Sequence, residues 1–104
     1  MKVRQISDWA LEDQLAVGGM TLVVLFMETG HRPTDIRRYE FRRVAREHPE
    51  VAFVEVDLLE NPSLAGRFSL SGAPVVLVFV RGAEVARHVG GQLETTVGRI
   101  LGPC

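Results

Sequence analysis

Hydrophobic and polar positions alternate along the chain between patterns typical of strands and patterns typical of helices. Thr21–Met27 and Val75–Val80 are continuous apolar runs rich in β-branched residues, and residues 51–57 form a third run of similar character. Such runs are typical of strands that are covered on both faces, as in an α/β sheet. The sequence therefore predicts a buried sheet with these three strands at its centre.

Helical spacing predicts four helices around these strands. The first is Asp8–Val17, which ends at Gly18-Gly19 and carries apolar residues near one stripe: Trp9, Leu11, Leu15 and Ala16. The second follows Pro33, spans about residues 34–48, and has this expected buried stripe: Ile36, Phe41, Val44 and Ala45. A short helix opens at Asn61-Pro62 and reaches Phe68, and a closing helix spans residues 92–101.

A tight turn at residues 81–83 and a further strand at residues 84–89 predict a hairpin after Val75–Val80, and a short first strand at residues 3–6 also fits. Strand–helix–strand steps require parallel pairing with right-handed crossovers, whereas the hairpin requires an antiparallel pair. We therefore expect an α/β fold. It has a mixed central sheet flanked by helices, a C-terminal β-hairpin and a closing helix, in one domain over residues 1–104.

The charge and the apolar runs narrow the classes of function. Lys and Arg number 12 against 13 Asp and Glu, for a net charge of −1, so nothing global attracts nucleic acid or an anionic membrane. The longest apolar run is far shorter than the ~20 residues that a membrane-spanning helix needs. The first residues lack the apolar core of a signal peptide. We therefore expect a cytoplasmic protein without a nucleic-acid or membrane partner.

Few residues could carry catalytic or metal chemistry. The one cysteine is Cys104, so no intrachain disulfide can form. His31, His48 and His88 have no cysteine or carboxylate at ligand spacing, and no Ser–His–acid arrangement is visible. We therefore predict no metal site and no cofactor.

The order of elements, with its glycines and prolines, resembles that of the thioredoxin family over residues 6–101. The most specific part is segment 68–82, FSLSGAPVVLVFVRG, in which Pro74 stands at the position of the family's cis-proline. Asp57, Asn61 and Pro62 fit the stretch after the third strand, and Gly90 matches the glycine that faces the active site. The resemblance implies a thioredoxin fold.

The resemblance breaks at the active-site loop. Where thioredoxins carry Trp-Cys-Gly-Pro-Cys, this chain has Gly30-His31-Arg32-Pro33-Thr34, so His31 and Thr34 replace the two cysteines. Leu25 stands where the family buries an Asp that assists proton transfer. Dithiol exchange needs a thiolate of low pKa and a resolving thiol beside it. We therefore do not expect a dithiol–disulfide oxidoreductase.

The resemblance also implies a groove that needs no thiol. In thioredoxin-like proteins an extended peptide pairs with the backbone of the residue before the cis-proline, here Ala73, as in strand addition. The expected groove residues are Gly30, His31, Arg32, Pro33, Thr34, Gly72, Ala73, Pro74 and Gly90. The leading hypothesis is a non-catalytic adaptor or chaperone that binds another protein or an extended peptide segment. Hydrogenase-maturation proteins of this fold, which the chain resembles in lacking the cysteines and around Gly66-Arg67-Phe68, offer a precedent.

Other hypotheses stay open. A thioredoxin-family redox protein could use non-dithiol chemistry, through Cys104 or the His31/Thr34 loop, and a structural module could form a homodimer through an exposed edge strand. The helix at residues 34–48 is also arginine-rich. It is either a solvated face with ion pairs such as Arg43 with Glu47, or a patch that docks an acidic partner. The arginines concerned are Arg32, Arg37, Arg38, Arg42, Arg43 and Arg46.

Overall fold

The computed structural model describes residues 3–17, 21–89 and 93–101. In order, the elements of this part of the chain are β1 (Arg4–Gln5), α1 (Asp8–Val17), β2 (Thr21–Met27), α2 (Arg32–Glu47), β3 (Ala52–Asp57), α3 (Ser63–Arg67), β4 (Val75–Val80), β5 (Ala83–His88) and α4 (Leu93–Leu101). Every predicted helix and strand is present, with small differences at the ends. The predicted break at Gly18-Gly19 and the first residue expected in the closing helix, Gln92, lie outside the described residues.

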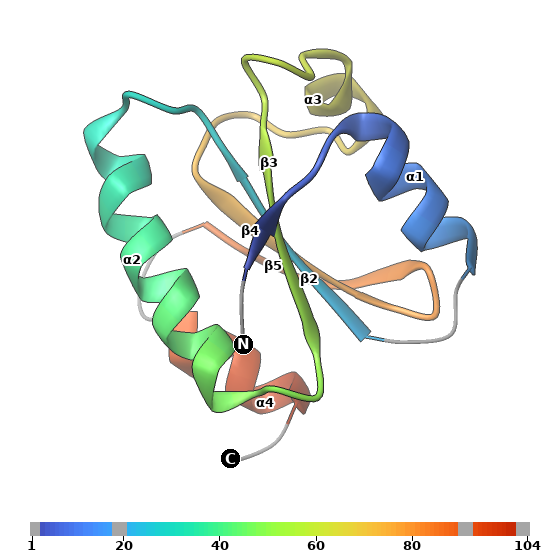
Figure 1. Cartoon of the computed structure of the whole chain (residues 1–104), viewed down its shortest axis with the longest axis vertical. Helices are drawn as coiled ribbons and strands as arrows, with labels where there is room; N and C mark the ends of the chain where they lie inside the picture. Colours follow the sequence, from blue (N-terminus) through green and yellow to red (C-terminus); the bar gives the residue numbers. More distant parts are fainter. Residues whose placement is uncertain (1–2, 18–20, 90–92, 102–104) are drawn as a thin grey trace.

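The strands form one mixed sheet in the order β1-β3-β2-β4-β5 (Figure 1). β3 pairs in parallel with β1 and β2, whereas β4 runs antiparallel to both β2 and β5. In this register Leu25 lies beside Glu55 on β3 and Val76 on β4. The predicted fold class is therefore confirmed, including the C-terminal hairpin and the closing helix.

Helices cover both faces of the sheet, as the continuous apolar strands require. On one face Val23, Leu25 and Met27 pack with side chains of α2 and α4. On the other face Leu22, Val24 and Phe26 pack with side chains of α1 and α3. Figure 1 shows α2 and α4 together on one side and α1 and α3 on the other. Among the helices of the described residues, none is long and apolar enough to cross a membrane.

The predicted burial of three helical residues is wrong. Ile36 is 64% exposed and Trp9 is 75% exposed, while Ala16 is also exposed. Ile36 lies five residues before the buried Phe41, which places it about 140° away around the helix. Trp9 lies two residues before the buried Leu11, so the two side chains point to opposite sides of α1. Helix geometry therefore turns both large apolar side chains towards solvent.

The turn between β4 and β5 depends on Gly82, and we predict that Gly82→Ala destabilises the fold. Gly82 has φ +81°, and an added Cβ would lie 2.8 Å from the backbone oxygen of Leu15. We expect the free energy of unfolding in urea to fall by about 1–3 kcal/mol. Gly30→Ala is the matched control, because Gly30 has φ +85° and nothing within 4 Å of such a Cβ. Equal losses in the two variants would contradict a role for the contact with α1.

Candidate peptide-binding groove

The loop that replaces the family's active-site motif leads directly into α2. His31 is exposed, has extended backbone dihedrals (φ −103°, ψ 122°), and makes no side-chain hydrogen bond that caps the helix. Pro33 occupies the first helical turn, where its missing N–H leaves no helical hydrogen bond unmade. The loop thus places His31, Arg32 and Pro33 at the surface.

Thr34 differs from its predicted place in the groove wall. Its side chain is fully buried, and its hydroxyl oxygen accepts a hydrogen bond of 3.3 Å from the N–H of Glu28. Thr34 lies seven residues before Phe41, or close to two helical turns, so both face the core. The prediction that Thr34 lines the groove is therefore wrong, because its hydroxyl supports the loop from beneath.

The loop before β4 forms one wall of a surface hollow. The Ala73–Pro74 peptide bond is cis. A hollow of about 330 Å³ runs along this loop between Leu70 and Val75. Arg87 on β5 and Val89, which follows β5, line its other side. Three predicted groove residues, Gly72, Ala73 and Pro74, line this hollow.

Arg87 on β5 holds the loop in position. Its guanidinium donates hydrogen bonds to the backbone oxygens of Phe68 (2.8 Å) and Ser69 (3.1 Å). It also pairs with Glu84 at 2.8 Å, and the hydrogen bonds between these two side chains raise the pKa of Arg87 and lower the pKa of Glu84. Sequence reasoning missed Arg87, because nothing local to β5 indicates which carbonyls it reaches.

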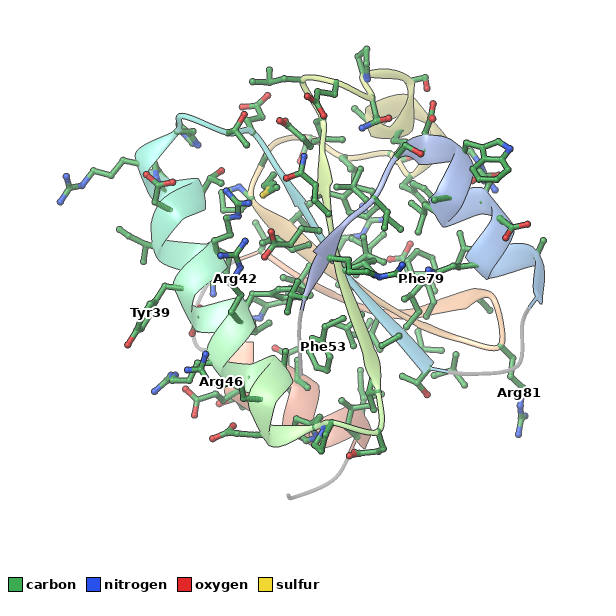
Figure 2. The ribbon with its side chains drawn as sticks, in the orientation of Figure 1. Tyr39, Arg42, Arg46, Phe53, Phe79 and Arg81 are labelled. Atoms are coloured by element: carbon green, nitrogen blue, oxygen red, sulfur yellow. The ribbon has the colours of Figure 1, made fainter. Side chains whose placement is uncertain are left out.

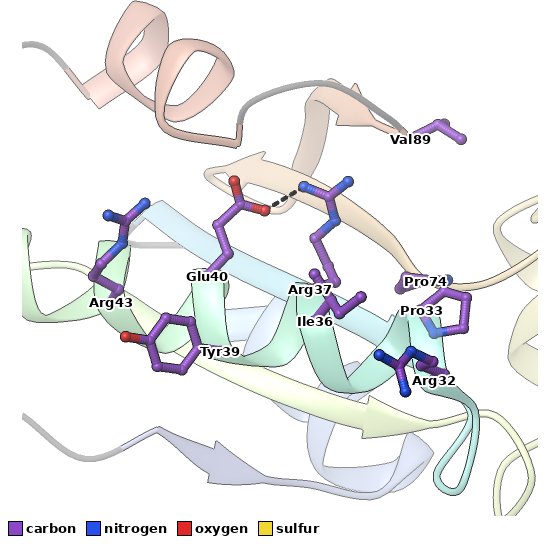
Figure 3. A pocket seen from close by; sticks show the side chains of 9 residues that line it. All are labelled: Arg32, Pro33, Ile36, Arg37, Tyr39, Glu40, Arg43, Pro74 and Val89. Carbon is purple, nitrogen blue, oxygen red and sulfur yellow. Dashed lines mark hydrogen bonds and ion pairs between the residues drawn. The ribbon is translucent and has the colours of Figure 1, made fainter.

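A second, larger cleft of about 610 Å³ adjoins the first hollow, and the two share Pro74 and Val89 (Figure 3). α2 supplies most of its wall, and the lining residues are Arg32, Pro33, Ile36, Arg37, Tyr39, Glu40, Arg43, Pro74 and Val89. Arg32, Pro33 and Pro74 were predicted for the groove, whereas the apolar contribution of Ile36, Tyr39 and Val89 was not. Gly30 and His31 are exposed nearby but line neither hollow, and Gly90 lies outside the described residues.

Behind this surface, two arginines of α2 hold a buried carboxylate. Glu55 on β3 is fully buried, and it accepts hydrogen bonds from Arg38 Nε (2.9 Å), Arg42 Nε (2.8 Å) and Arg42 Nη2 (3.0 Å). The hydrogen bond to Glu55 raises the pKa of Arg42. Figure 2 shows Arg42 over the sheet, whereas Tyr39 points away from it. The arginine-rich helix is therefore partly a set of structural ion pairs rather than a purely solvated face.

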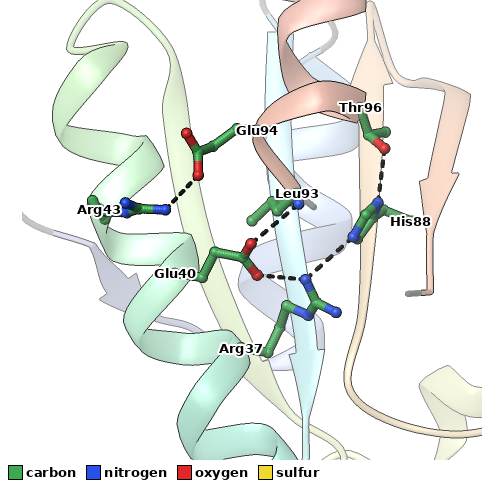
Figure 4. Close-up of polar contacts among 7 residues, drawn as sticks. All are labelled: Arg37, Glu40, Arg43, His88, Leu93, Glu94 and Thr96. Carbon is green, nitrogen blue, oxygen red and sulfur yellow. Dashed lines mark hydrogen bonds and ion pairs between the residues drawn. The ribbon is translucent and has the colours of Figure 1, made fainter. Parts of the chain in front are cut away.

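A polar network ties α2 to β5 and α4 beside the larger cleft (Figure 4). Arg37 pairs with Glu40 and lies 3.2 Å from His88 Nε2, and His88 Nδ1 lies 2.7 Å from Thr96 Oγ1. A guanidinium only donates, so Nε2 is the acceptor and Nδ1 carries the proton of a neutral His88. Glu40 also accepts a hydrogen bond of 3.2 Å from the N–H of Leu93, which fixes the start of α4.

Arg43 extends this connection to α4, because it pairs with Glu94. The predicted pair of Arg43 with Glu47 is therefore wrong: Glu94, which is distant in sequence, lies within reach of the same guanidinium.

Among the described residues, no group of His, Cys, Asp or Glu side chains is placed to hold a metal ion.

The residues after β3 have structural partners. Asp57 is 3% exposed, and it accepts hydrogen bonds from the Thr29 hydroxyl (2.8 Å) and the Leu59 N–H (3.0 Å). Asn61 donates to the Asp57 carbonyl (2.9 Å) and accepts from the N–H of Asp8 (3.0 Å). These contacts anchor α1 and the loop around Thr29, so Asp57 and Asn61 serve the framework of the site.

This fold, with a cis-proline loop facing the start of a long helix, is that of known thioredoxins. A thioredoxin from Echinococcus granulosus is 30% identical over 99 residues, covering 95% of this chain and 91% of that protein. A thioredoxin from Chlamydia trachomatis is 31% identical over 88 residues, covering 85% and 84%. The chain therefore belongs to the thioredoxin family, and the predicted membership is confirmed.

Solved structures agree with this assignment. The X-ray structure of Fasciola hepatica thioredoxin matches with a TM-score of 0.78 and 26% identity, over 94% of each chain. Reduced Schistosoma mansoni thioredoxin pre-protein matches over the whole of both chains with a TM-score of 0.85, and at 21% identity this likeness shows the fold alone. No protein-family model matches the chain.

Proposed function

We propose that this chain is a thioredoxin-family protein that does not exchange disulfides and instead acts as an adaptor or chaperone. It holds an extended segment of another protein in the hollow beside Ala73 and Pro74. The observation that carries this proposal is that the hollow is present although the chain has one cysteine, Cys104, and therefore no cysteine pair. Strand addition at the Ala73 backbone needs no thiol.

Two features favour binding in this hollow. Arg87 fixes the loop through Phe68 and Ser69, so a bound segment would order little of the protein, and a preorganised site loses less free energy on binding. The surface around the loop is also apolar, since Val89 is 69% exposed next to Pro74. A client segment would therefore gain backbone hydrogen bonds at Ala73 and apolar contacts on either side.

Blocking the hollow tests the proposal, and Ala73→Arg is the variant that fills it. The ligand is a permanently unfolded polypeptide with carboxymethylated cysteines, and its binding is measured by fluorescence anisotropy with and without dithiothreitol. We expect wild type to bind equally in both conditions and Ala73→Arg to bind at least about tenfold more weakly, a loss of roughly 1.4 kcal/mol. Ala83→Arg is the matched control, because Ala83 is exposed at the start of β5.

The outcomes separate the proposal from its main alternative. Equal binding by Ala73→Arg and Ala83→Arg would exclude the groove as the binding site. A redox role without a cysteine pair is the second candidate, and the relatives named thioredoxin favour it. Thr34 is buried and bonded to Glu28, so this role would fall to His31 or to Cys104, which lies outside the described residues. A native-lysate partner captured only without reductant, and lost in Cys104→Ser, would establish that role.

A cytoplasmic location, a homodimer and the likeness to hydrogenase-maturation proteins stay predictions. The single-domain organisation over residues 1–104 is likewise a prediction.

A further inference from the structure

The outer face of α2 has an unusual distribution of charge. The chain as a whole has a net charge of −1, yet α2 holds six arginines and only three carboxylates. Along its solvent side, Arg32, Ile36, Tyr39 and Arg43 follow one another at helical spacing, so that two large apolar side chains lie between two arginines. Ile36 and Tyr39 are 64% and 72% exposed.

The cleft beside this stripe has more arginines than carboxylates among its lining residues. Arg32, Arg37 and Arg43 line it against one carboxylate, that of Glu40. Glu40 is held by Arg37 and Leu93, and Arg43 pairs with Glu94, so these groups are fixed in place. The side chain of Arg32 makes no ion pair or hydrogen bond with the other described residues, and Figure 3 shows it next to Pro33 and Pro74. Its charge is therefore available to a ligand at the point where the two hollows meet.

We propose that the bound segment continues from Ala73 past Pro74 into this cleft, and that it is an acidic segment with apolar anchors. An apolar side chain would lie against Ile36, Tyr39 and Val89, and a carboxylate would lie beside Arg32, the lining arginine whose charge is not already paired. The two hollows share Pro74 and Val89, so one extended chain can occupy both. This inference rests on the proposed function and adds the chemistry of the partner. Charge complementarity of this kind selects among partners more than it adds affinity.

The test uses three synthetic peptides of equal length. Each alternates β-branched residues with one polar residue type, which favours an extended backbone, and carries a central Phe. The polar residue is Glu in the first peptide, Gln in the second and Lys in the third. We expect wild type to bind the Glu peptide tightest and the Lys peptide weakest, and this preference should fade in high salt.

Reversing one charge should reverse the preference. Arg32→Glu is expected to weaken binding of the Glu peptide about three- to tenfold and to strengthen that of the Lys peptide, as for the gain or loss of one or two exposed ion pairs. Tighter binding of the Lys peptide cannot result from misfolding of the variant. A carboxylate at position 32 also suits the first turn of a helix, so the substitution should not destabilise α2. Arg81→Glu is the control, because it changes the charge by the same amount at a distant site. Arg81 is exposed in the turn between β4 and β5, away from α2 (Figure 2).

The outcomes distinguish the acidic preference inferred here from the groove binding that is the proposed function. If Ala73→Arg abolishes binding of all three peptides but Arg32→Glu leaves their order unchanged, the groove holds and the acidic preference is overturned. The same conclusion follows if Arg81→Glu shifts the order as much as Arg32→Glu does. If none of the peptides binds wild type, both the inference and the proposed function fail.

Discussion

The variant that lacks both partners of Glu55, Arg38→Ala/Arg42→Ala, is expected to lose about 3–5 kcal/mol of unfolding free energy at neutral pH. Glu55 is fully buried on β3, and its two oxygens accept hydrogen bonds only from these two arginines among the described residues. Their removal leaves the carboxylate of a residue that is fully buried in the wild type without a counter-charge. Urea unfolding followed by circular dichroism measures the loss.

Two further measurements show whether the loss comes from the stranded charge. Adding Glu55→Leu to the double variant removes the carboxylate and is expected to restore much of the stability, since an apolar group of similar size is tolerated in the core. Arg46→Ala, at an exposed arginine of the same helix, should change stability by no more than about 0.5 kcal/mol. A double variant as stable as Arg46→Ala would show that Glu55 does not depend on the pair.

The sheet could be predicted from the sequence because its signal is local. β2 and β4 consist almost wholly of apolar, mostly branched residues, and the structure buries them on both faces. The side that a single helical residue faces depends on its spacing from the residues that define the buried stripe. Ile36 and Trp9 are apolar, yet their angles relative to Phe41 and Leu11 turn them outwards. Composition could not reveal this, because both residues suit a core.

The resemblance to thioredoxins predicted those residues of the candidate groove that belong to the family's sequence motifs. Pro33, Gly72, Ala73 and Pro74, all named from the motif, line the hollows. The residues that hold the site were missed, because their partners lie far away in sequence: Arg87 reaches Phe68 and Ser69, and Arg43 reaches Glu94. Glu55 did carry a signal, as a charged residue inside an apolar run, but only the three-dimensional arrangement shows that α2 neutralises it.

Restoring the cysteine pair by His31→Cys/Thr34→Cys is expected to produce a catalyst of insulin reduction by dithiothreitol. The proposed function holds that wild type fails because it lacks the thiols, while the framework of the family's loop remains. His31 is exposed directly before α2, where the helix dipole would lower the pKa of an introduced thiol. Position 34 is buried one turn inside, with a side chain of similar size. Holding two thiols together should raise the rate about tenfold or more over dithiothreitol alone.

The single variants separate dithiol chemistry from mere thiol reactivity. His31→Cys alone has no resolving thiol, so its mixed disulfides with insulin are released only by dithiothreitol and its rate should stay close to that of dithiothreitol alone. All variants are best made in a Cys104→Ser background. Leu25 is fully buried and offers no group that accepts a proton, so the double variant should remain slower than a thioredoxin. Insulin reduction by wild type would overturn the proposed loss of activity. A folded double variant without activity would instead show that the loop has moved away from the geometry that dithiol exchange needs, and that the groove has been reshaped for binding alone.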